Sequence, residues 1–251
     1  MDALARRSYA RFRVRTLAAA CTDDGVRRAM LGEAPLPAGY GRGMEERVVE
    51  YPWVLARLPS GADPILDAGS TLNFPWVLDL PRLRSSRIVI FTLAPEGVIP
   101  SERVSYMYGD LRETVLRDAA FDVVVCISTL EHVGMDNTRY AAGGGARDGG
   151  GYEQALAELR RVLRPGGSLL LTVPFGRATD LGWFRVLDSA DLDGAVGAFG
   201  GQERAREVFR HHPESGWNRV AESDAADAGF GGDDGLGTMA EAVACLHLVR
   251  P

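Results

Sequence analysis

Lysine is absent from the sequence, and cysteine is scarce. All 28 basic residues among the 251 are therefore arginine, which suggests a GC-rich coding genome and leads us to expect a bacterial protein. The three cysteines, Cys21, Cys126 and Cys245, are widely spaced, so neither a disulfide framework nor a zinc site can be assembled from them. A reducing compartment fits this usage best, and we expect a cytoplasmic protein.

Long apolar runs and an excess of positive charge are also missing. No stretch approaches the ~20 apolar residues that a membrane-spanning helix needs, so we expect no membrane partner. The formal net charge of −6 disfavours a polyanion such as nucleic acid as a partner. No His, Asp or Glu cluster has metal-ligand spacing, so no metal is expected. The sequence leaves the oligomeric state open.

The length and composition are those of an ordinary globular chain. With 46% hydrophobic and 25% charged residues, the chain suits one large α/β domain that carries a small cap. We expect residues 1–60 to form this helical cap. It would contain helices within 1–31, a Pro- and Gly-rich connector over 32–43, and a helix bent or restarted at Pro52.

Beyond residue 61, short apolar runs alternate with helix-like stretches. Several runs are apolar on both faces, which is typical of strands in a covered parallel sheet. The alternation predicts a doubly wound α/β sheet. The expected strands are 64–68, 87–92, 103–108, 121–127, 168–173, 204–209 and 241–249, and the expected helices are 152–163 and 188–199. Two glycine-rich segments, 142–151 and 229–237, are interpreted as loops.

Four segments carry chemistry, three of them at strand ends. Ligands of open α/β sheets bind at the carboxyl ends of strands, and a helix start at Thr71–Asn73 would offer free N–H groups. The four segments are ILDAGSTLNF (65–74), YMYGDLRE (106–113), FDVVVCISTLEHVGMDN (121–137) and ELRRVLRPGGSLLLTVPFG (158–176).

In this order and at these spacings, the segments resemble class I S-adenosylmethionine-dependent methyltransferases. More narrowly, they are similar to a small-molecule branch with LEHV and L-RPGG-L signatures, some members of which act on sugars, amino sugars or other natural-product scaffolds. The resemblance covers residues 44–175, and a strand near 249 would complete the sheet. It implies a Rossmann-like, doubly wound sheet of seven strands with a reversed last hairpin, in a catalytic domain over 61–251.

The resemblance also implies S-adenosylmethionine as the cofactor and assigns its contacts. The turn after the first strand would wrap the methionine part, with Asp67 facing the amino group directly or through water. Asp110 would bind the adenine amino group, and the end of the fourth strand would lie beneath the sulfonium. The expected cofactor-binding residues are Asp67, Ala68, Gly69, Ser70, Thr92, Asp110, Leu111, Ser128 and Thr129.

Two departures from the family pattern concern this cofactor site. Ser70, Thr71 and Asn73 stand where the family commonly has further glycines, so the first loop should be stiffer. The second strand usually ends in an acidic residue that binds the ribose, whereas Thr92 stands there with Glu96 four residues on. Three alternatives follow: Thr92 makes a single hydrogen bond, Glu96 reaches back, or ribose binding is weak.

Methyl transfer requires alignment and, for a hydroxyl acceptor, a base. His132 is the first candidate, because an imidazole has a suitable pKa and follows a cofactor-binding strand. Asp136 is the second candidate. Alternatively, Glu131 and His132 only order their loop.

The acceptor is expected to contact the N-terminal helices and two insertions, near 133–151 and 177–237. The predicted function is transfer of a methyl group to oxygen or nitrogen of a small molecule, such as a sugar or amino sugar in natural-product or antibiotic biosynthesis. The alternatives are a non-catalytic methyltransferase-like scaffold and a same-fold enzyme with non-methyl chemistry.

Overall fold

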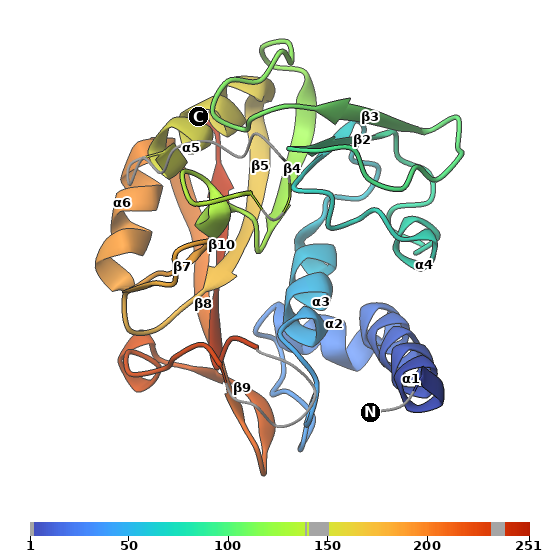
Figure 1. Cartoon of the computed structure of the whole chain (residues 1–251), viewed down its shortest axis with the longest axis vertical. Coiled ribbons are helices and arrows are strands. Elements are labelled where there is room, and N and C mark those ends of the chain that lie inside the picture. The colour runs from blue at the N-terminus through green and yellow to red at the C-terminus, as the bar shows by residue number, and fades with distance from the viewer. Residues whose placement is uncertain (1–2, 139, 141–150, 232–238) are drawn as a thin grey trace.

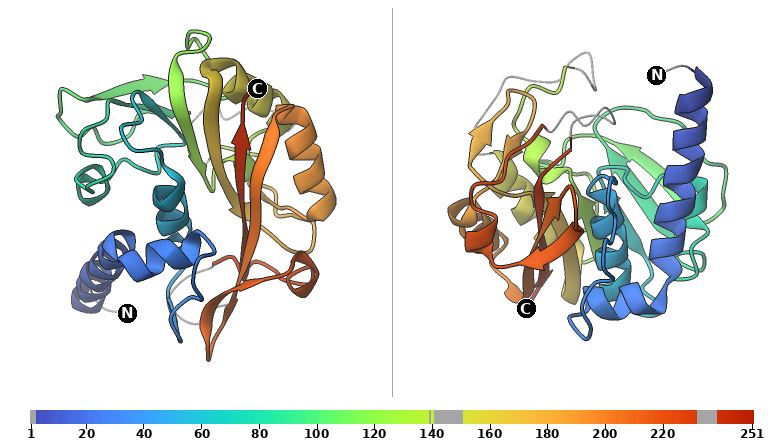
Figure 2. Two further views of the ribbon diagram at one scale, coloured as in Figure 1. Left: turned by 180° about the vertical axis from the view of Figure 1, so that it is seen from behind. Right: turned by 90° about the horizontal axis from the view of Figure 1, so that it is seen from below.

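The structure is a computed structural model that describes residues 3–138, 140, 151–231 and 239–251. Within these residues a central sheet is covered by helices on both of its faces (Figure 1). Figure 2 shows the same layers from behind and from below. No helix among the described residues is both long enough and apolar enough to cross a membrane.

The main sheet of the described residues has the strand order β3-β2-β1-β4-β5-β10-β8-β9. The first five strands in this order are parallel, whereas β10 runs antiparallel to both of its neighbours. The strands are β1 (Ile65–Ala68), β2 (Ile88–Thr92), β3 (Val104–Tyr108), β4 (Phe121–Ile127), β5 (Leu163–Pro174), β8 (Gln202–His212), β9 (Gly216–Val220) and β10 (Ala242–Val249). A separate hairpin joins β6 (Thr179–Asp180) to β7 (Arg185–Val186).

The predicted Rossmann-like, mostly parallel sheet is confirmed, but the predicted count of seven strands is wrong. The described residues place eight strands in this sheet, because β9 pairs with β8 at the edge. The segment GWNRV offers little alternation of apolar and polar residues that would reveal a strand. It is anchored instead by Trp217, which is fully buried and donates from Nε1 to the Met44 carbonyl at 2.9 Å.

Helices cover the two faces of the sheet through separate apolar cores. Along β4, Val123 and Val125 pack in one core and Val124 and Cys126 in the other, as the pleat requires. The first core includes side chains of α1 (Ala3–Thr22), α2 (Asp24–Met30), α3 (Arg47–Arg57) and α4 (Pro75–Leu78). The second includes side chains of α5 (Gly151–Val162) and α6 (Ser189–Phe199).

Of the two alternatives at Pro52, a bent or a restarted helix, the restart is wrong, because α3 continues through it from Arg47 to Arg57. Proline has no N–H, so the carbonyl four residues earlier loses its helical donor. That carbonyl belongs to Val48, and the Tyr40 hydroxyl donates to it at 2.6 Å. This hydrogen bond from the Tyr40 side chain satisfies the Val48 carbonyl, so that α3 stays continuous through Pro52.

Candidate active site

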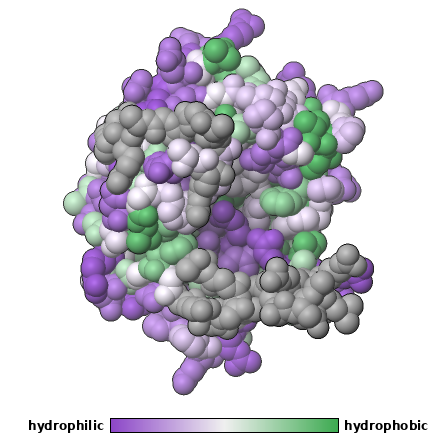
Figure 3. All heavy atoms as spheres, viewed as in Figure 1, coloured by the Kyte–Doolittle hydropathy of each residue, from purple (hydrophilic) through white to green (hydrophobic). Residues whose placement is uncertain are grey.

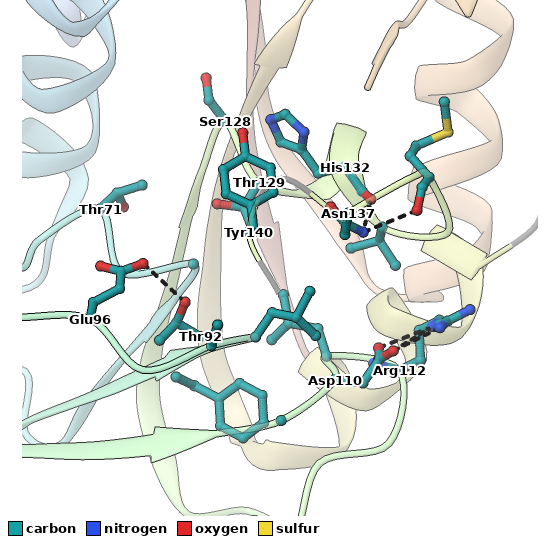
Figure 4. Close-up of a pocket in the computed structure, with 18 of the residues that line it drawn as sticks. Thr71, Thr92, Glu96, Asp110, Arg112, Ser128, Thr129, His132, Asn137 and Tyr140 are labelled. Atoms are coloured by element: carbon teal, nitrogen blue, oxygen red, sulfur yellow. Dashed lines mark hydrogen bonds and ion pairs between the residues drawn. The ribbon is translucent and has the colours of Figure 1, made fainter. Parts of the chain in front are cut away.

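A pocket of about 490 Å³ opens at the carboxyl ends of β1, β2, β3 and β4 (Figure 4). These strands are parallel neighbours, so their ends meet at one edge of the sheet. Figure 3 shows a hollow with a hydrophilic floor on this side of the molecule. The residues that line the pocket include Arg47, Gly69, Thr71, Thr92, Leu93, Glu96, Gly109, Asp110, Leu111, Arg112, Ser128, Thr129 and His132.

The turn after β1 (residues 67–72, the β1 turn) is organised around Asp67, whose side chain is fully buried. Its Oδ1 accepts from the Thr71 N–H and hydroxyl, both at 3.1 Å, and its Oδ2 accepts from the Leu72 N–H at 2.7 Å. Burial raises the pKa of Asp67 to about 7, although these bonds oppose the shift. The expected helix start at Thr71 is therefore wrong: Asp67 takes up the N–H groups, and α4 begins only at Pro75.

Gly69 brings the β1 turn against the end of β4. Its φ is +126°, and a Cβ atom there would lie 2.0 Å from the Thr129 Oγ1. Only glycine permits both this backbone conformation and this approach. The two turns therefore meet side by side in the wall of the pocket.

The end of β2 holds a carboxylate that comes from the following loop. The Thr92 hydroxyl donates to Glu96 Oε1 at 3.2 Å, and the Ser70 hydroxyl donates to Glu96 Oε2 at 2.8 Å. Figure 4 shows Glu96 and Thr92 joined at one side of the pocket. Glu96 therefore lies beside Thr92 at this strand end, which is the geometry that the second of the three alternatives requires.

Asp110, at the end of β3, lines the pocket and is held by Arg112. The Arg112 Nε lies 3.0 and 3.1 Å from the two carboxylate oxygens, and Nη2 lies 2.7 Å from Oδ2. These bonds keep the pKa of Asp110 below its usual range, because they stabilise the charged form. Asp110 is thus an ionised carboxylate, which retains acceptor capacity beyond the bonds from Arg112.

The turn after β4 (residues 128–133, the β4 turn) connects the pocket to α3. The Ser128 hydroxyl donates to Glu50 Oε1 at 2.6 Å, and so does the Thr172 hydroxyl of β5. Arg47, which lines the pocket, forms an ion pair with the other oxygen of this fully buried carboxylate. The N-terminal helices thereby contribute a charged side chain to the pocket wall.

His132 ends η1 (Leu130–His132) and lines the same pocket. Its Nδ1 lies 2.9 Å from the Trp183 carbonyl oxygen. Because a carbonyl can only accept, Nδ1 must carry the hydrogen, and in the neutral ring Nε2 holds the lone pair. Trp183 and Tyr140 pack on the imidazole with ring centroids 5.2 and 5.6 Å away.

The structure places seven of the eleven predicted site residues in the pocket lining. These are Gly69, Thr92, Asp110, Leu111, Ser128, Thr129 and His132. Asp67, Ala68, Ser70 and Asp136 do not line it, and Asp67 and Ser70 act instead on their neighbours Thr71 and Glu96. Asp136 is exposed and bonds its own loop, accepting from the Thr138 N–H at 3.0 Å.

Sequence reasoning missed the contribution of α3 to the site. Glu50 lies 78 residues before Ser128, which donates to it, and Arg47 pairs with Glu50, so no local motif links these segments. One sequence signal for this contribution exists: two charged residues interrupt the apolar face of a helix, which indicates that they have polar partners.

Comparison with known families indicates which kind of domain forms this pocket. Residues 87–171 match the model of the methyltransferase domain. The match covers about a third of the chain, from β2 through β5, and includes three of the four strand ends that form the pocket. It indicates S-adenosylmethionine as the methyl donor. No curated protein sequence matches the chain.

Solved structures share this methyltransferase fold at low sequence identity. The complex between the Haloferax volcanii methyltransferase activator Trm112 and its methyltransferase matches with 16% identity and a TM-score of 0.51, over 94% of this chain and 97% of that chain. An S-adenosylmethionine-dependent methyltransferase from Mesorhizobium loti matches with 14% identity and a TM-score of 0.51, over 80% and 97%. The [4+2]-cyclase SpnF matches over 60% of this chain and 56% of its own, with 20% identity and a TM-score of 0.43.

The residues of the pocket fit this cofactor chemically. A nucleoside needs acceptors for its ribose hydroxyls and adenine amino group, and Glu96 and Asp110 place carboxylates on neighbouring strand ends. Apolar side chains of Phe91, Leu93 and Leu111 also line the pocket. Across the described residues, no group of three or more His, Cys, Asp and Glu side chains is arranged to hold a metal ion.

Proposed function

We propose that the protein is an S-adenosylmethionine-dependent methyltransferase that acts on an oxygen or nitrogen atom of a small molecule. A sugar or amino-sugar moiety of a natural product is the acceptor class that we favour. The observation that carries the proposal is the pocket itself, in which the ends of four parallel strands bring together glycine backbone, two carboxylates and a histidine.

In this proposal the cofactor lies along the strand ends from β4 to β3. Glu96, fixed by Ser70 and Thr92, accepts from the ribose hydroxyls in place of the acidic residue that a strand end usually supplies. Asp110 accepts from the adenine amino group, and Gly69 leaves room for the methionine portion next to Thr129. When bound, S-adenosylmethionine supplies an electrophilic methyl group on a positively charged sulfur.

His132 is the proposed general base of the reaction. Its neutral tautomer is set by the Trp183 carbonyl, so Nε2 is the nitrogen that takes a proton. The Trp183 bond also ties the catalytic ring to the segment between β6 and β7. Substrate contacts made by that segment would therefore influence the orientation of the imidazole.

The acceptor is proposed to lie against Arg47 and His132, in the part of the pocket where α3 meets the β4 turn. Arg47 lines the pocket from the N-terminal side, which supports a role for residues 1–60 as a cap over the acceptor. Within the second expected acceptor segment, 177–237, Trp183 lies against His132. The first segment, 133–151, lies partly outside the described residues, and its role stays a proposal.

Calorimetric titration with S-adenosylhomocysteine, the demethylated product of the cofactor, tests the proposed function. We expect micromolar binding of S-adenosylhomocysteine and no binding of NADH, which carries the same adenosine on a different cofactor. Failure to bind the homocysteine product would reject the enzyme assignment and leave the non-catalytic scaffold. Two observations favour that second candidate: Asp67 bonds its own turn and does not line the pocket, and Arg112 already forms an ion pair with Asp110.

A further inference from the structure

Glu131 is a buried acidic residue that the proposed chemistry has not yet used. It lies in the β4 turn directly before His132, and its side chain is only 2% exposed. Its Oε2 is buried and has no hydrogen-bond partner among the described residues. Leaving a buried polar atom unpaired is unfavourable, because the atom gives up its hydrogen bonds to water and gains none in return. Ordering the loop alone does not explain why such a costly side chain stands there.

The other carboxyl oxygen of Glu131 faces the proposed base. Its Oε1 lies 4.0 Å from Nε2 of His132, within the range of an ion pair if the imidazole is protonated. The Trp183 carbonyl fixes the opposite ring nitrogen, Nδ1, as the one that carries hydrogen in the neutral ring. A proton taken up by His132 therefore arrives on Nε2, the nitrogen that faces the carboxyl group.

Several charged and titratable groups surround this pair. Glu46, Arg47 and Glu50 from α3 act on Glu131, and Glu131 in turn acts on Cys126 of β4. On the side of His132 stand Tyr140 and Arg185, whose Nη2 donates to the Val133 carbonyl at 3.0 Å. Burial raises the pKa of Glu131 well above its usual range, and Arg47 opposes this shift. The pocket thus contains two neighbouring groups whose protonation is interdependent.

We propose that Glu131 is a positioning residue for His132 and stabilises the imidazolium form of the base. In the step, an O–H or N–H bond of the acceptor breaks, and the proton forms a new N–H bond at Nε2. When Glu131 is ionised, its carboxylate oxygen 4.0 Å away faces the positive ring, and the Glu131 side chain is only 2% exposed to water. The role in catalysis rests on the proposed function, whereas the pairing of the two groups can be measured without any acceptor.

Proton NMR titration of the histidine rings tests this pairing directly. The chain has only four histidines, so the ring signal of His132 can be assigned by its loss in His132→Gln. The titration is run on the full chain with S-adenosylhomocysteine present. In Glu131→Gln we expect the midpoint of the His132 curve to fall by about one pH unit, a tenfold loss of proton affinity, and the curve to become a single step.

Two controls separate pairing from damage to the fold. His247 titrates far from this site, bonded to Ser168 at 2.9 Å, and its curve should not change. Glu131→Asp keeps the charge on a shorter side chain, so its His132 midpoint should fall between those of wild type and Glu131→Gln. This second variant carries the test if Glu131→Gln does not fold.

Superimposable His132 curves in wild type and the Glu131 variants would overturn the proposal. That result is distinct from failure of the proposed function, which is the absence of S-adenosylhomocysteine binding in wild type. Once an acceptor is known, Glu131→Gln should lower kcat at least tenfold, with KM and cofactor affinity unchanged. The loss should be greatest on the alkaline side of the pH profile, because the lower His132 midpoint leaves more of the neutral base at acid pH.

Discussion

Two neighbouring turns at the same edge of the sheet each bury a carboxyl group, and the two groups differ in their hydrogen bonds. Asp67 in the β1 turn accepts three hydrogen bonds from its own turn. Glu131 in the β4 turn keeps one oxygen without a partner among the described residues. Burial raises the pKa of both groups. The satisfied carboxyl shapes the backbone, and we infer that the unsatisfied one is retained for function.

The largest effect is expected where the two turns touch. In Gly69→Ala the new Cβ would lie 2.0 Å from the Thr129 Oγ1, at a φ of +126°. We expect a loss of at least ~2 kcal/mol in the free energy of unfolding, measured in urea. The affinity for S-adenosylhomocysteine should fall more than a hundredfold, because both pocket walls must move.

Gly61→Ala is the matched control for this substitution. Gly61 also has a positive φ, +75°, but a Cβ there would meet no atom within 4 Å. Gly61→Ala therefore measures the effect of backbone strain alone, whereas Gly69→Ala adds steric overlap with Thr129. Equal losses in the two variants would show that the turns do not depend on their contact.

Asp67→Ala should destabilise the protein by about 3 kcal/mol in urea unfolding. The substitution leaves the buried Leu72 N–H and the partly buried Thr71 N–H without an acceptor, and bonds to a carboxylate are among the stronger ones. Asp136→Ala, which removes an exposed carboxylate that also accepts from a backbone N–H and a threonine hydroxyl, serves as the control. A small effect at Asp67 would contradict its structural role.

Glu96→Gln should weaken S-adenosylhomocysteine binding about tenfold, as expected for loss of a charge-assisted hydrogen bond. Glu96 belongs to the network of the β1 turn through Ser70, but its carboxylate also faces the pocket. Calorimetry gives the affinity, and thermal unfolding should change little. Glu102→Gln, at an exposed glutamate outside the pocket lining, should leave the affinity unchanged. If Glu96→Gln binds S-adenosylhomocysteine as tightly as wild type, Glu96 does not bind the ribose and Thr92 is left as the residue that does.

Glu131→Met should leave the protein as stable as wild type or more stable, by about 1 kcal/mol at pH 8. Burial raises the folded pKa of Glu131 above its unfolded value. The folded state therefore binds this proton more tightly, and the contribution of Glu131 to stability declines as pH rises through the folded pKa. The advantage of the methionine variant should accordingly shrink toward pH 4. A clear loss of stability at pH 8 would make Glu131 a structural residue like Asp67.

Asp136→Asn should have the smallest effect, with cofactor affinity and turnover close to wild type. Asp136 follows the β4 turn, yet it is exposed and outside the pocket lining. Turnover measured with an identified acceptor checks this expectation. A large loss of turnover at unchanged affinity would restore Asp136 as a candidate base.

The sequence predicted those parts of the site that depend on local patterns. Strand ends at Asp110 and Thr129 follow from apolar runs that stop at polar residues, and the structure places both in the pocket. The orientation of Asp67 could not be predicted in this way, because it depends on whether a turn or a helix follows. The position of Glu96 could not be predicted either, because it depends on Ser70 and Thr92, from two different strand ends, both donating hydrogen bonds to its carboxylate.

Long-range contacts account for the remaining differences. The Glu50 carboxylate reaches Ser128 across 78 positions of the chain, and no periodicity encodes such a pair. The edge strand β9 was not predicted because contacts distant in sequence anchor it. Trp217 Nε1 donates to the Met44 carbonyl, and Arg219 Nη2 donates to the carbonyls of Ala29 and Met30. Apolar patterns specify which face of an element is buried, whereas polar partners depend on the completed tertiary structure.

The most direct measurement is a crystal structure of the protein with S-adenosylhomocysteine. We predict that the nucleoside occupies the pocket at the ends of β1–β4, with the Glu96 oxygens ~2.6–3.0 Å from the ribose hydroxyls. Glu96 should still be held by Ser70 and Thr92, and Asp67 should remain bonded to its own turn. A ribose bound elsewhere, or a β1 turn that opens so that Asp67 faces the ligand, would contradict the central claim.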